Sequence, residues 1–186
     1  MKACSIFAPA KINIALKVVG KRGDGYHELN TIFQTISLGD DITIRIGCIG
    51  IKIDGPPWLS AGPGNLAFKA ADAFYRQIAR PMETRISLHK RVPMQAGLGG
   101  GSSDAAAVLL GLNTLYGGVL AVEELSLVAK GIGSDVNYFL DGGTAFGYGR
   151  GEQIEILPEL PSFWLRVVKP PFGLRTPEVF AAWQGN

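Results

Sequence analysis

The sequence predicts an α+β fold, because segments with the two-residue periodicity of strands fill its first quarter and helical and extended segments alternate after that. The chain has 186 residues, which is enough for one domain with a sizeable core and short for two. Hydrophobic residues make up 47% of it and charged residues 18%, as is typical of an ordered globular domain.

The first quarter of the chain is expected to be mostly sheet. In residues 11–19 apolar and polar residues alternate, which predicts a strand with one buried face. On that buried face we place Ile12, Ile14, Leu16 and Val18. A turn rich in glycine follows at residues 21–27. Further strands are predicted at residues 29–38, 41–47 and 49–55.

Helices and strands are expected to mix in the middle of the chain. Asn65 is predicted to cap a helix whose apolar residues recur at about every fourth position as far as Ile78. Residues 84–93 read as a strand that leads into a glycine-rich loop. Residues 104–112 are apolar on every side, which is typical of a fully buried helix.

The following segments complete the expected domain. A second helix is predicted within residues 121–133, with Gly131 as its stop signal, and a short third helix begins at Ser134. Repeated glycines in residues 142–157 indicate a bent hairpin, and residues 163–170 read as a further strand.

The last residues predict the start of a helix. Thr176 is a good N-cap, and Pro177 stands at the first helical position, where its missing N–H costs nothing. Val179, Phe180 and Trp183 begin an apolar stripe, and the chain stops three residues later. We therefore expect that a larger protein has been cut or that a second domain is absent.

Composition argues against several classes of protein. The net charge of +2 is spread along the chain, so no basic stripe favours nucleic acid as a partner. Cys4 and Cys48 lack the spacing of a zinc site or a disulfide framework. The apolar run at the N-terminus is broken by Pro9 and Lys11, and no stretch reaches the ~20 apolar residues of a membrane helix. A cytoplasmic location is the expectation; the oligomeric state has no signal.

A glycine-rich loop is the strongest functional signal. Residues 93–106 read PMQAGLGGGSSDAA, and they connect a predicted strand to a predicted helix. Such a loop can be a turn with close backbone packing, but free N–H groups and the positive end of a helix dipole also make it a site for phosphate. No lysine follows the glycines as in a Walker A loop, and Ser102 stands where the third glycine of G-x-G-x-x-G would be. The loop is therefore a candidate site for a triphosphate of another type.

Other polar residues carry little information when each is taken alone. Lys11 and Asn13 share the face opposite the apolar stripe of their strand, which most simply predicts a solvated face. Asp135 fits an acid near the start of a helix, and the Tyr26–His27 pair follows a turn, where side chains are usually solvated.

Taken together with the loop, these residues form a known pattern. The loop resembles the second motif of the galactokinase, homoserine kinase, mevalonate kinase and phosphomevalonate kinase (GHMP) superfamily, P-x-x-x-G-L-G-S-S-A-A. The stretches PAKINIAL, KRGDGYHEL, GSDVNYFLDGGTAFGYGRGE and RTPEVF narrow the resemblance to the branch that phosphorylates a cytidine diphosphate-linked methylerythritol in non-mevalonate isoprenoid biosynthesis. The match runs from the start of the chain to about Phe180.

The resemblance implies a fold, a reaction and two domains. The fold would be the N-terminal domain of these kinases, which is similar to a ribosomal protein domain, over residues 1–158. Residues 159–186 would begin a ferredoxin-like C-terminal domain that is largely absent. The reaction would be ATP-dependent phosphorylation of the tertiary 2-hydroxyl of 4-diphosphocytidyl-2-C-methyl-D-erythritol, with Mg²⁺ as a cofactor.

The resemblance also assigns roles to residues. Asp135 would accept the proton of the attacking hydroxyl, and Lys11 would favour the ionised carboxylate and stabilise the developing charge. The residues expected to bind the nucleotide are Pro93, Met94, Gln95, Ala96, Gly97, Leu98, Gly99, Gly100, Gly101, Ser102, Ser103, Asn65 and Lys90. Those expected to bind the substrate are Asn13, Tyr26, His27, Thr176 and Phe180. Ser102 or Ser103 is the candidate ligand for Mg²⁺.

One departure from the family pattern leaves alternatives open. The third glycine-rich motif, which belongs to the second domain and closes over the phosphates, is not found in residues 176–186. One alternative is therefore that the chain alone is inactive, as a non-catalytic domain that binds nucleotide weakly or pairs with another polypeptide through its cut face. Another kinase of the superfamily, of the mevalonate or homoserine kinase type, is a further alternative, against which the Tyr26–His27 pair argues.

Overall fold

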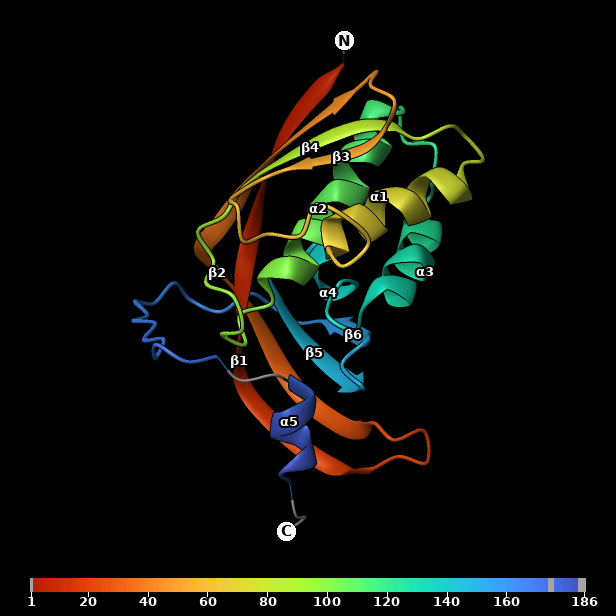
Figure 1. The fold of residues 1–186 in the computed structure, drawn as a ribbon. Coiled ribbons are helices and arrows are strands. Elements are labelled where there is room, and N and C mark those ends of the chain that lie inside the picture. Colours follow the sequence, from red (N-terminus) through yellow and green to blue (C-terminus); the bar gives the residue numbers. More distant parts are fainter. Residues whose placement is uncertain (1, 174–175, 184–186) are drawn as a thin grey trace.

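The computed structural model describes residues 2–173 and 176–183 and shows the α+β fold (Figure 1). In chain order the elements are β1 (Ala3–Lys21), β2 (His27–Ile46), β3 (Gly50–Asp54), α1 (Leu66–Gln77), β4 (Glu83–His89), α2 (Gly100–Leu115), α3 (Val122–Ile132), α4 (Tyr138–Asp141), β5 (Thr144–Gly149), β6 (Gln153–Ile156) and α5 (Thr176–Ala181). Among the described residues, no helix has the length and apolar character needed to cross a bilayer.

β2 is the central strand of the sheet. It pairs with β1 along almost its whole length, and on its other edge it pairs with β4 through residues 41–46 and with β5 through residues 29–34. These pairs are antiparallel, as is the pair β5–β6, whereas β3 lies parallel to β4. Residues 35–40 of β2 belong to neither the β4 nor the β5 ladder, and the glycine-rich loop reaches the sheet beside this interval.

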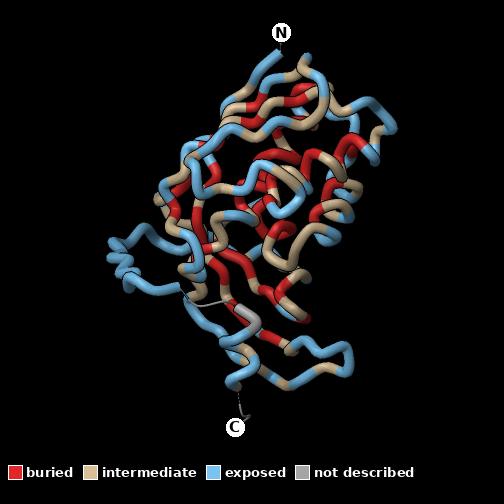
Figure 2. The backbone as a smooth tube through the Cα atoms, viewed as in Figure 1, coloured by how far each residue is buried: buried red, intermediate tan, exposed pale blue. Residues whose placement is uncertain are grey.

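The helices α1 to α4 lie together on one face of the sheet, whereas α5 lies apart from them (Figure 1). α2 is the middle helix and contacts β1, β2, α1 and α3. Its apolar residues pack with those of β2 and β4, and the backbone coloured as buried in Figure 2 concentrates in this helix and the strands beneath it. The largest fully buried aliphatic side chains of this core are Ile42, Ile44, Ile86, Leu109 and Leu112. Both cysteines are free thiols.

Gly39 on β2 packs tightly against β1, and it carries a stability prediction. A Cβ at this buried glycine would lie 2.6 Å from the Ala8 carbonyl oxygen, and the Phe7 ring would be displaced as well. We expect Gly39→Ala to lower the free energy of unfolding by about 1–3 kcal/mol, as overpacking of a close-packed site does. Urea denaturation measures this, with Gly20→Ala as the control, because a Cβ at Gly20 on β1 meets nothing within 4 Å. Equal midpoints for the two variants would contradict the prediction.

The strands differ from the sequence prediction in two respects. The segments 29–38 and 41–47 form one continuous strand, β2, rather than two. In β1, Ile14 is 46% and Leu16 52% exposed, so the predicted buried face is wrong there. Register shifts between Pro9 and Ala15 change which face each residue meets, and the outer part of the β1–β2 hairpin extends beyond α1 to α4 (Figures 1 and 2).

The helices also begin and end at other residues than predicted. α2 begins at Gly100, inside the glycine run, rather than at Asp104, because Gly99 adopts a left-handed conformation and acts as the N-cap. α3 continues through Gly131 to Ile132. The short helix α4 begins at Tyr138, after a turn at residues 134–137.

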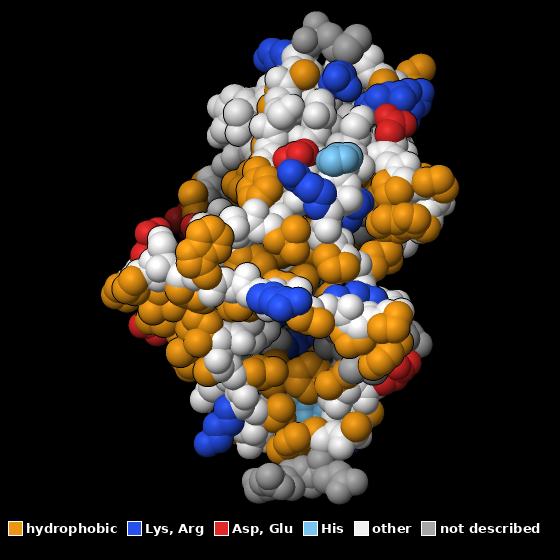
Figure 3. Space-filling model, turned by 90° about the vertical axis from the view of Figure 1, so that its left-hand side faces the viewer, with side chains coloured by type: hydrophobic (Ala, Val, Ile, Leu, Met, Phe, Trp, Pro, Cys, Tyr) orange, Lys and Arg blue, Asp and Glu red, His pale blue; other side chains and the backbone are white. Residues whose placement is uncertain are grey.

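The predicted strand at residues 163–170 is wrong. This segment has no regular secondary structure, and every residue in it is exposed. Figure 3 shows hydrophobic side chains gathered across the face that this part of the chain occupies. The apolar residues that remain exposed here are Leu160, Phe163, Trp164, Leu165, Val167, Val168 and Phe172. Strand geometry needs a neighbouring strand, and the described sheet ends at β6 without reaching this segment.

Candidate active site at the glycine loop

The glycine-rich loop enters α2 with its backbone open to a ligand. Gln95, Gly97 and Gly99 have φ values of 53°, 72° and 69°, so the loop takes a path that favours glycine. The first intrahelical bond runs from the N–H of Ser103 to the carbonyl oxygen of Gly99 at 2.9 Å. The N–H groups of residues 100–102 precede it and have no acceptor within the helix, as at any helix start. This is the arrangement of backbone donors that binds anions.

Glycine is required at two of these positions for packing as well. A Cβ on Gly99 would lie 2.8 Å from the Phe139 ring and 3.1 Å from Cγ of Lys11, and one on Gly100 would lie 2.9 Å from Cγ1 of Val92. The close-packing interpretation of the loop is therefore correct for its last part, and it holds together with the anion geometry.

Lys11 lies between the loop and Asp135. Its backbone N–H donates to the carbonyl oxygen of Leu98 at 2.9 Å. Its Nζ donates to Oδ1 of Asn13 at 2.7 Å and lies 3.6 Å from Oδ2 of Asp135. Lys11 is only 6% exposed, and its ammonium group lies 5.3 Å from the centre of the Phe33 ring. The interpretation of this strand face as solvated is wrong at Lys11.

The two residues beside Lys11 are a fixed amide and a partly exposed carboxylate. Nδ2 of Asn13 donates to Oγ1 of Thr31 at 2.6 Å, and that hydroxyl donates to the carbonyl oxygen of Ala15 at 2.7 Å, so the amide of Asn13 is fixed. The side chain of Asp135 is 31% exposed and can meet a solvent-borne group. A buried cation, a fixed amide and an accessible carboxylate thus converge beside the loop.

The predicted substrate residues near the β1–β2 turn have other neighbours than expected. His27 stacks on Phe180 with ring centres 5.4 Å apart, and it meets Trp183 edge-on at the same distance. Tyr26 is 54% exposed, and the guanidinium of Arg150 lies 4.8 Å from its ring centre. Tyr26 and Phe180 are therefore engaged with different partners. The side chain of Thr176 lies outside the described residues.

Asn65 and the loop serines have defined positions. Asn65 caps α1 as predicted, because its Oδ1 accepts from the N–H of Ala67 at 2.9 Å, and its Nδ2 donates to the Ser60 carbonyl oxygen at 2.8 Å. Ser102 is partly exposed, whereas Oγ of Ser103 is buried without a hydrogen-bond partner among the described residues. Those residues also contain no cluster of three or more His, Cys, Asp or Glu side chains suited to a metal ion.

The ammonium group of Lys90 is buried between two carboxylates. It forms ion pairs with Asp40 and, at 2.5 Å, with Asp104, and the three side chains are 5%, 0% and 4% exposed. Oδ1 of Asp40 accepts from the N–H groups of Arg91 at 2.5 Å and Val92 at 2.8 Å. Oδ1 of Asp104 is buried without a partner in the described chain. We call Asp40, Lys90 and Asp104 the buried triad.

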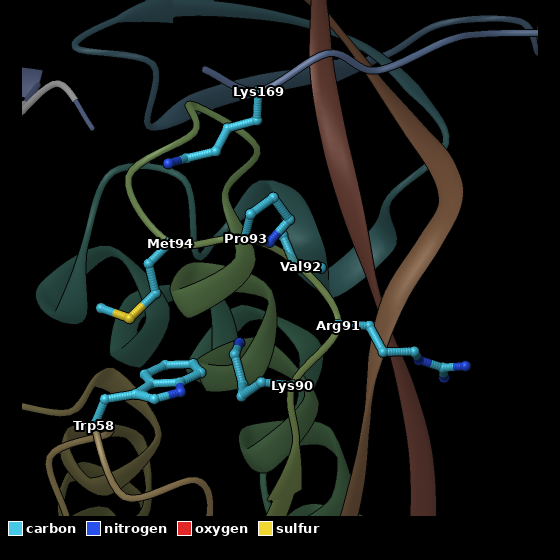
Figure 4. Close-up of a pocket in the computed structure, with 7 residues that line it drawn as sticks. All are labelled: Trp58, Lys90, Arg91, Val92, Pro93, Met94 and Lys169. Carbon is cyan, nitrogen blue, oxygen red and sulfur yellow. The ribbon is translucent and has the colours of Figure 1, made fainter. Parts of the chain in front are cut away.

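Two residues that the sequence did not single out also lie in this region. Trp58 lines a cavity of about 350 Å³ with Lys90, Met94, Lys169 and neighbours, and its ring lies next to the Met94 side chain (Figure 4). Arg150 reaches Tyr26 from the turn after β5. Trp58 stands in a loop rich in proline and glycine, and Arg150 stands in the stretch GYGRGE. An aromatic or a cationic residue among glycines was therefore the only sequence signal that could have pointed to either residue.

The buried triad predicts a pH effect on stability. Burial raises the pKa of Asp104 to about 7, with Lys90 opposing the increase and Asp40 adding to it. In the unfolded chain the pKa of an aspartate is about 3.9. Between these values the folded chain holds a proton that the unfolded chain has released, so this group lowers the free energy of unfolding as pH rises from about 4 to about 7.

Asp104→Asn is therefore expected to gain stability relative to the unaltered chain as pH rises through this window. Urea denaturation at pH 5 and pH 8 measures the difference in the free energy of unfolding between the two proteins. Asp72→Asn on α1, whose carboxylate pairs with Arg76 near the surface, is the control, and its gap should change little. A gap for Asp104→Asn that is the same at both pH values would contradict the prediction.

Comparison with known proteins supports the family resemblance. Residues 65–148 match the model of the GHMP kinases N terminal domain. The chain is 44% identical over 188 residues to the 4-diphosphocytidyl-2-C-methyl-D-erythritol kinase of Moorella thermoacetica, covering 100% of this chain and 65% of that protein. It is 46% identical over 180 residues to the protein of the same name from Protochlamydia amoebophila, covering 97% of this chain and 62% of the relative. The chain thus spans less than two thirds of the length of these relatives.

Solved structures agree with this assignment. A crystal structure of 4-(cytidine 5'-diphospho)-2C-methyl-D-erythritol kinase superposes with a TM-score of 0.73 at 42% identity, over 83% of this chain and 55% of that one. A homoserine kinase from Cytophaga hutchinsonii superposes with a TM-score of 0.64 at 19% identity, over 86% of this chain and 52% of that one, and shows the shared fold alone. The chain therefore shares its fold with these kinases, and its residues 65–148 match the N-terminal domain of the GHMP kinases.

Proposed function

We propose that the chain contributes the catalytic half of an ATP-dependent kinase that phosphorylates the tertiary 2-hydroxyl of 4-diphosphocytidyl-2-C-methyl-D-erythritol. The observation that carries the proposal is the position of Lys11, whose backbone is bonded to the glycine loop while its side chain contacts Asn13 and Asp135. The phosphate would thus bind on one side of the buried Lys11 ammonium, and the attacking hydroxyl would bind on the other. The names of the relatives support the substrate.

In the proposed reaction, Asp135 accepts the proton of the substrate hydroxyl while that oxygen forms a bond to the γ-phosphorus of ATP. The bond from this phosphorus to the β–γ bridging oxygen breaks, and ADP leaves. Lys11 stabilises the negative charge that develops between carboxylate and phosphate. Asn13, fixed by Thr31, is placed to orient the hydroxyl. Alignment and charge stabilisation supply most of the rate in phosphoryl transfer.

The loop fits a triphosphate by its geometry. Left-handed glycines would let the backbone approach a ligand closely, and the N–H groups of residues 100–102 would donate to an anion at the start of α2. Trp58 and Met94 offer an apolar surface for the adenine ring in the adjoining cavity. Ser102, which is partly exposed, is the hydroxyl that we assign to Mg²⁺ or phosphate, rather than the buried Ser103. Bound Mg²⁺ would neutralise phosphate charge.

We assign the cytidine end to the region of the β1–β2 turn. Tyr26 presents an exposed ring that Arg150 covers on one side, and His27 carries ring nitrogens suited to a base edge. Because His27 now stacks on Phe180 and Trp183, a base that binds between these rings has to separate them. We keep the division into a catalytic domain at residues 1–158 and the start of a second domain at residues 159–186 as part of the proposal.

A turnover assay with labelled ATP tests the function. We expect phosphorylation of the cytidine diphosphate substrate and none of mevalonate or homoserine. Transfer to mevalonate instead would favour the other kinase type of the superfamily. Binding of MgATP by calorimetry without any turnover would favour a non-catalytic nucleotide-binding domain, an alternative consistent with the exposed apolar side chains of residues 160–172.

A further inference from the structure

The two ends of the glycine loop meet at the buried triad. At the first end, Lys90 leads into the loop, and the next two backbone N–H groups are bound by Asp40. At the other end, Asp104 stands one turn into α2 and is bound by the ammonium of Lys90. Asp40 itself lies in the interval of β2 that pairs with neither β4 nor β5. One charged cluster therefore joins the central strand, the loop entrance and the helix that follows the loop.

Packing reinforces this junction. Val92 is 3% exposed, and a Cβ on Gly100 would lie 2.9 Å from its Cγ1 and 3.6 Å from Oδ2 of Asp40. The first residue of α2 thus rests directly on the loop entrance. Between these ends, residues 94–97 are partly or fully exposed, and the next part of the loop held by a backbone hydrogen bond is Leu98, whose carbonyl oxygen accepts from the N–H of Lys11. The conformation of the exposed part therefore depends on how its ends are held.

The charges of the triad have a second consequence. Two buried carboxylates near the start of α2 would oppose a phosphate at the same place. Lys90 lies between them and offsets this charge, and its ammonium is thereby engaged with protein groups. Its side chain is 5% exposed, although the residue lines the cavity with Trp58. Because the side chain is buried and two of the three N–H donors of this ammonium face carboxylates, direct contact with a nucleotide would need the side chain to move.

We infer that the buried triad is a positioning device for the glycine loop, through which Asp104 and Lys90 set the phosphate-binding N–H groups without touching the nucleotide. The part of this inference that concerns ATP binding rests on the proposed function. The part that concerns the conformation of the loop does not. It replaces the direct contact with nucleotide that the sequence suggested for the Lys90 side chain.

Asp104→Ala and Asp104→Asn test the inference as a pair. Both remove the same negative charge, but asparagine keeps an oxygen that can accept from Lys90, and alanine does not. Alanine also has the highest helix propensity, so α2 should persist. Asp72→Asn on α1 is the control. Affinity for inorganic tripolyphosphate, MgATP and adenosine is measured by calorimetry at pH 8, and amide hydrogen exchange is measured without ligand.

For Asp104→Ala we expect affinity for tripolyphosphate and MgATP to fall about tenfold, with adenosine unchanged within about twofold. Asp104→Asn should lose less affinity, because its side-chain oxygen can still accept a hydrogen bond from Lys90. Exchange at residues 94–102 should accelerate in the same order, while residues 109–112 in the core of α2 stay protected.

Three results would overturn the inference. Equal losses for adenosine and tripolyphosphate would show general damage to the cavity. Unchanged or higher affinity for tripolyphosphate in both variants would show that charge removal alone matters. Unaltered exchange at residues 94–102 would show that the triad does not hold the loop. If the unaltered chain binds neither phosphate ligand, the proposed function fails, and the exchange measurement alone decides the role of the triad.

Discussion

Asp135→Asn is expected to lower kcat by about 10²–10⁴-fold, the usual contribution of a positioned general base. Asparagine has nearly the same shape and cannot accept the proton of the substrate hydroxyl. The side chain stands 3.6 Å from Nζ of Lys11 and is accessible to substrate. The measurement is steady-state turnover of the cytidine substrate, in a form of the protein that contains this chain and is active.

The matched control is Asp141→Asn. Asp141 is exposed at the end of α4, six residues along the chain, and plays no part in the proposed reaction. We expect its kcat to stay within about twofold of the unaltered enzyme. An Asp135→Asn enzyme with normal kcat would remove this carboxylate from the role of base.

Lys90→Met is expected to cost about 3–5 kcal/mol of unfolding free energy at pH 8, because it leaves two buried carboxylates without their cation. Asp40 keeps the two backbone N–H groups from which it accepts, whereas the carboxylate of Asp104 loses the ammonium that donates to it. The same substitution at Lys52, which is exposed on β3, gives the reference. Urea denaturation compares the two, and a difference below about 1 kcal/mol would show that the triad is not a stabilising ion cluster.

Sequence periodicity predicted the elements whose partners are close by. The cap of α1 depends on Asn65 and a backbone N–H two residues away, and the hairpin of β5 and β6 depends on the glycines between its strands. Such local signals are complete within a few residues. The α+β class followed from their order.

Features that depend on distant residues were not predictable. The burial of Lys11 follows from strand irregularities and from the contact with Leu98, which no local pattern encodes. The triad joins Asp40 to Lys90 across 50 positions. Residues 163–170 have strand-like composition, but a strand also needs a neighbour, and composition does not supply one.

The candidate site also has parts that the sequence predicted and parts that only the structure shows. The resemblance carried the motif residues, and the structure brings Lys11, Asn13 and Asp135 to one place beside the loop. In the structure the rings of His27 and Phe180 stack on each other, although the resemblance had assigned both to the cytosine ring of the substrate. Trp58 and Arg150 lie outside the motif positions that had been given roles, so only their placement in space makes them candidates.

The double attachment of Lys11 has a mechanical consequence. One residue is bonded through its backbone to the glycine loop and through its side chain to the acidic group opposite. A ligand that shifts the backbone at Leu98 would therefore act on the same residue whose ammonium lies beside Asp135. In the proposed reaction, this one residue would link the position of the phosphate-binding loop to the position of the group that accepts the proton.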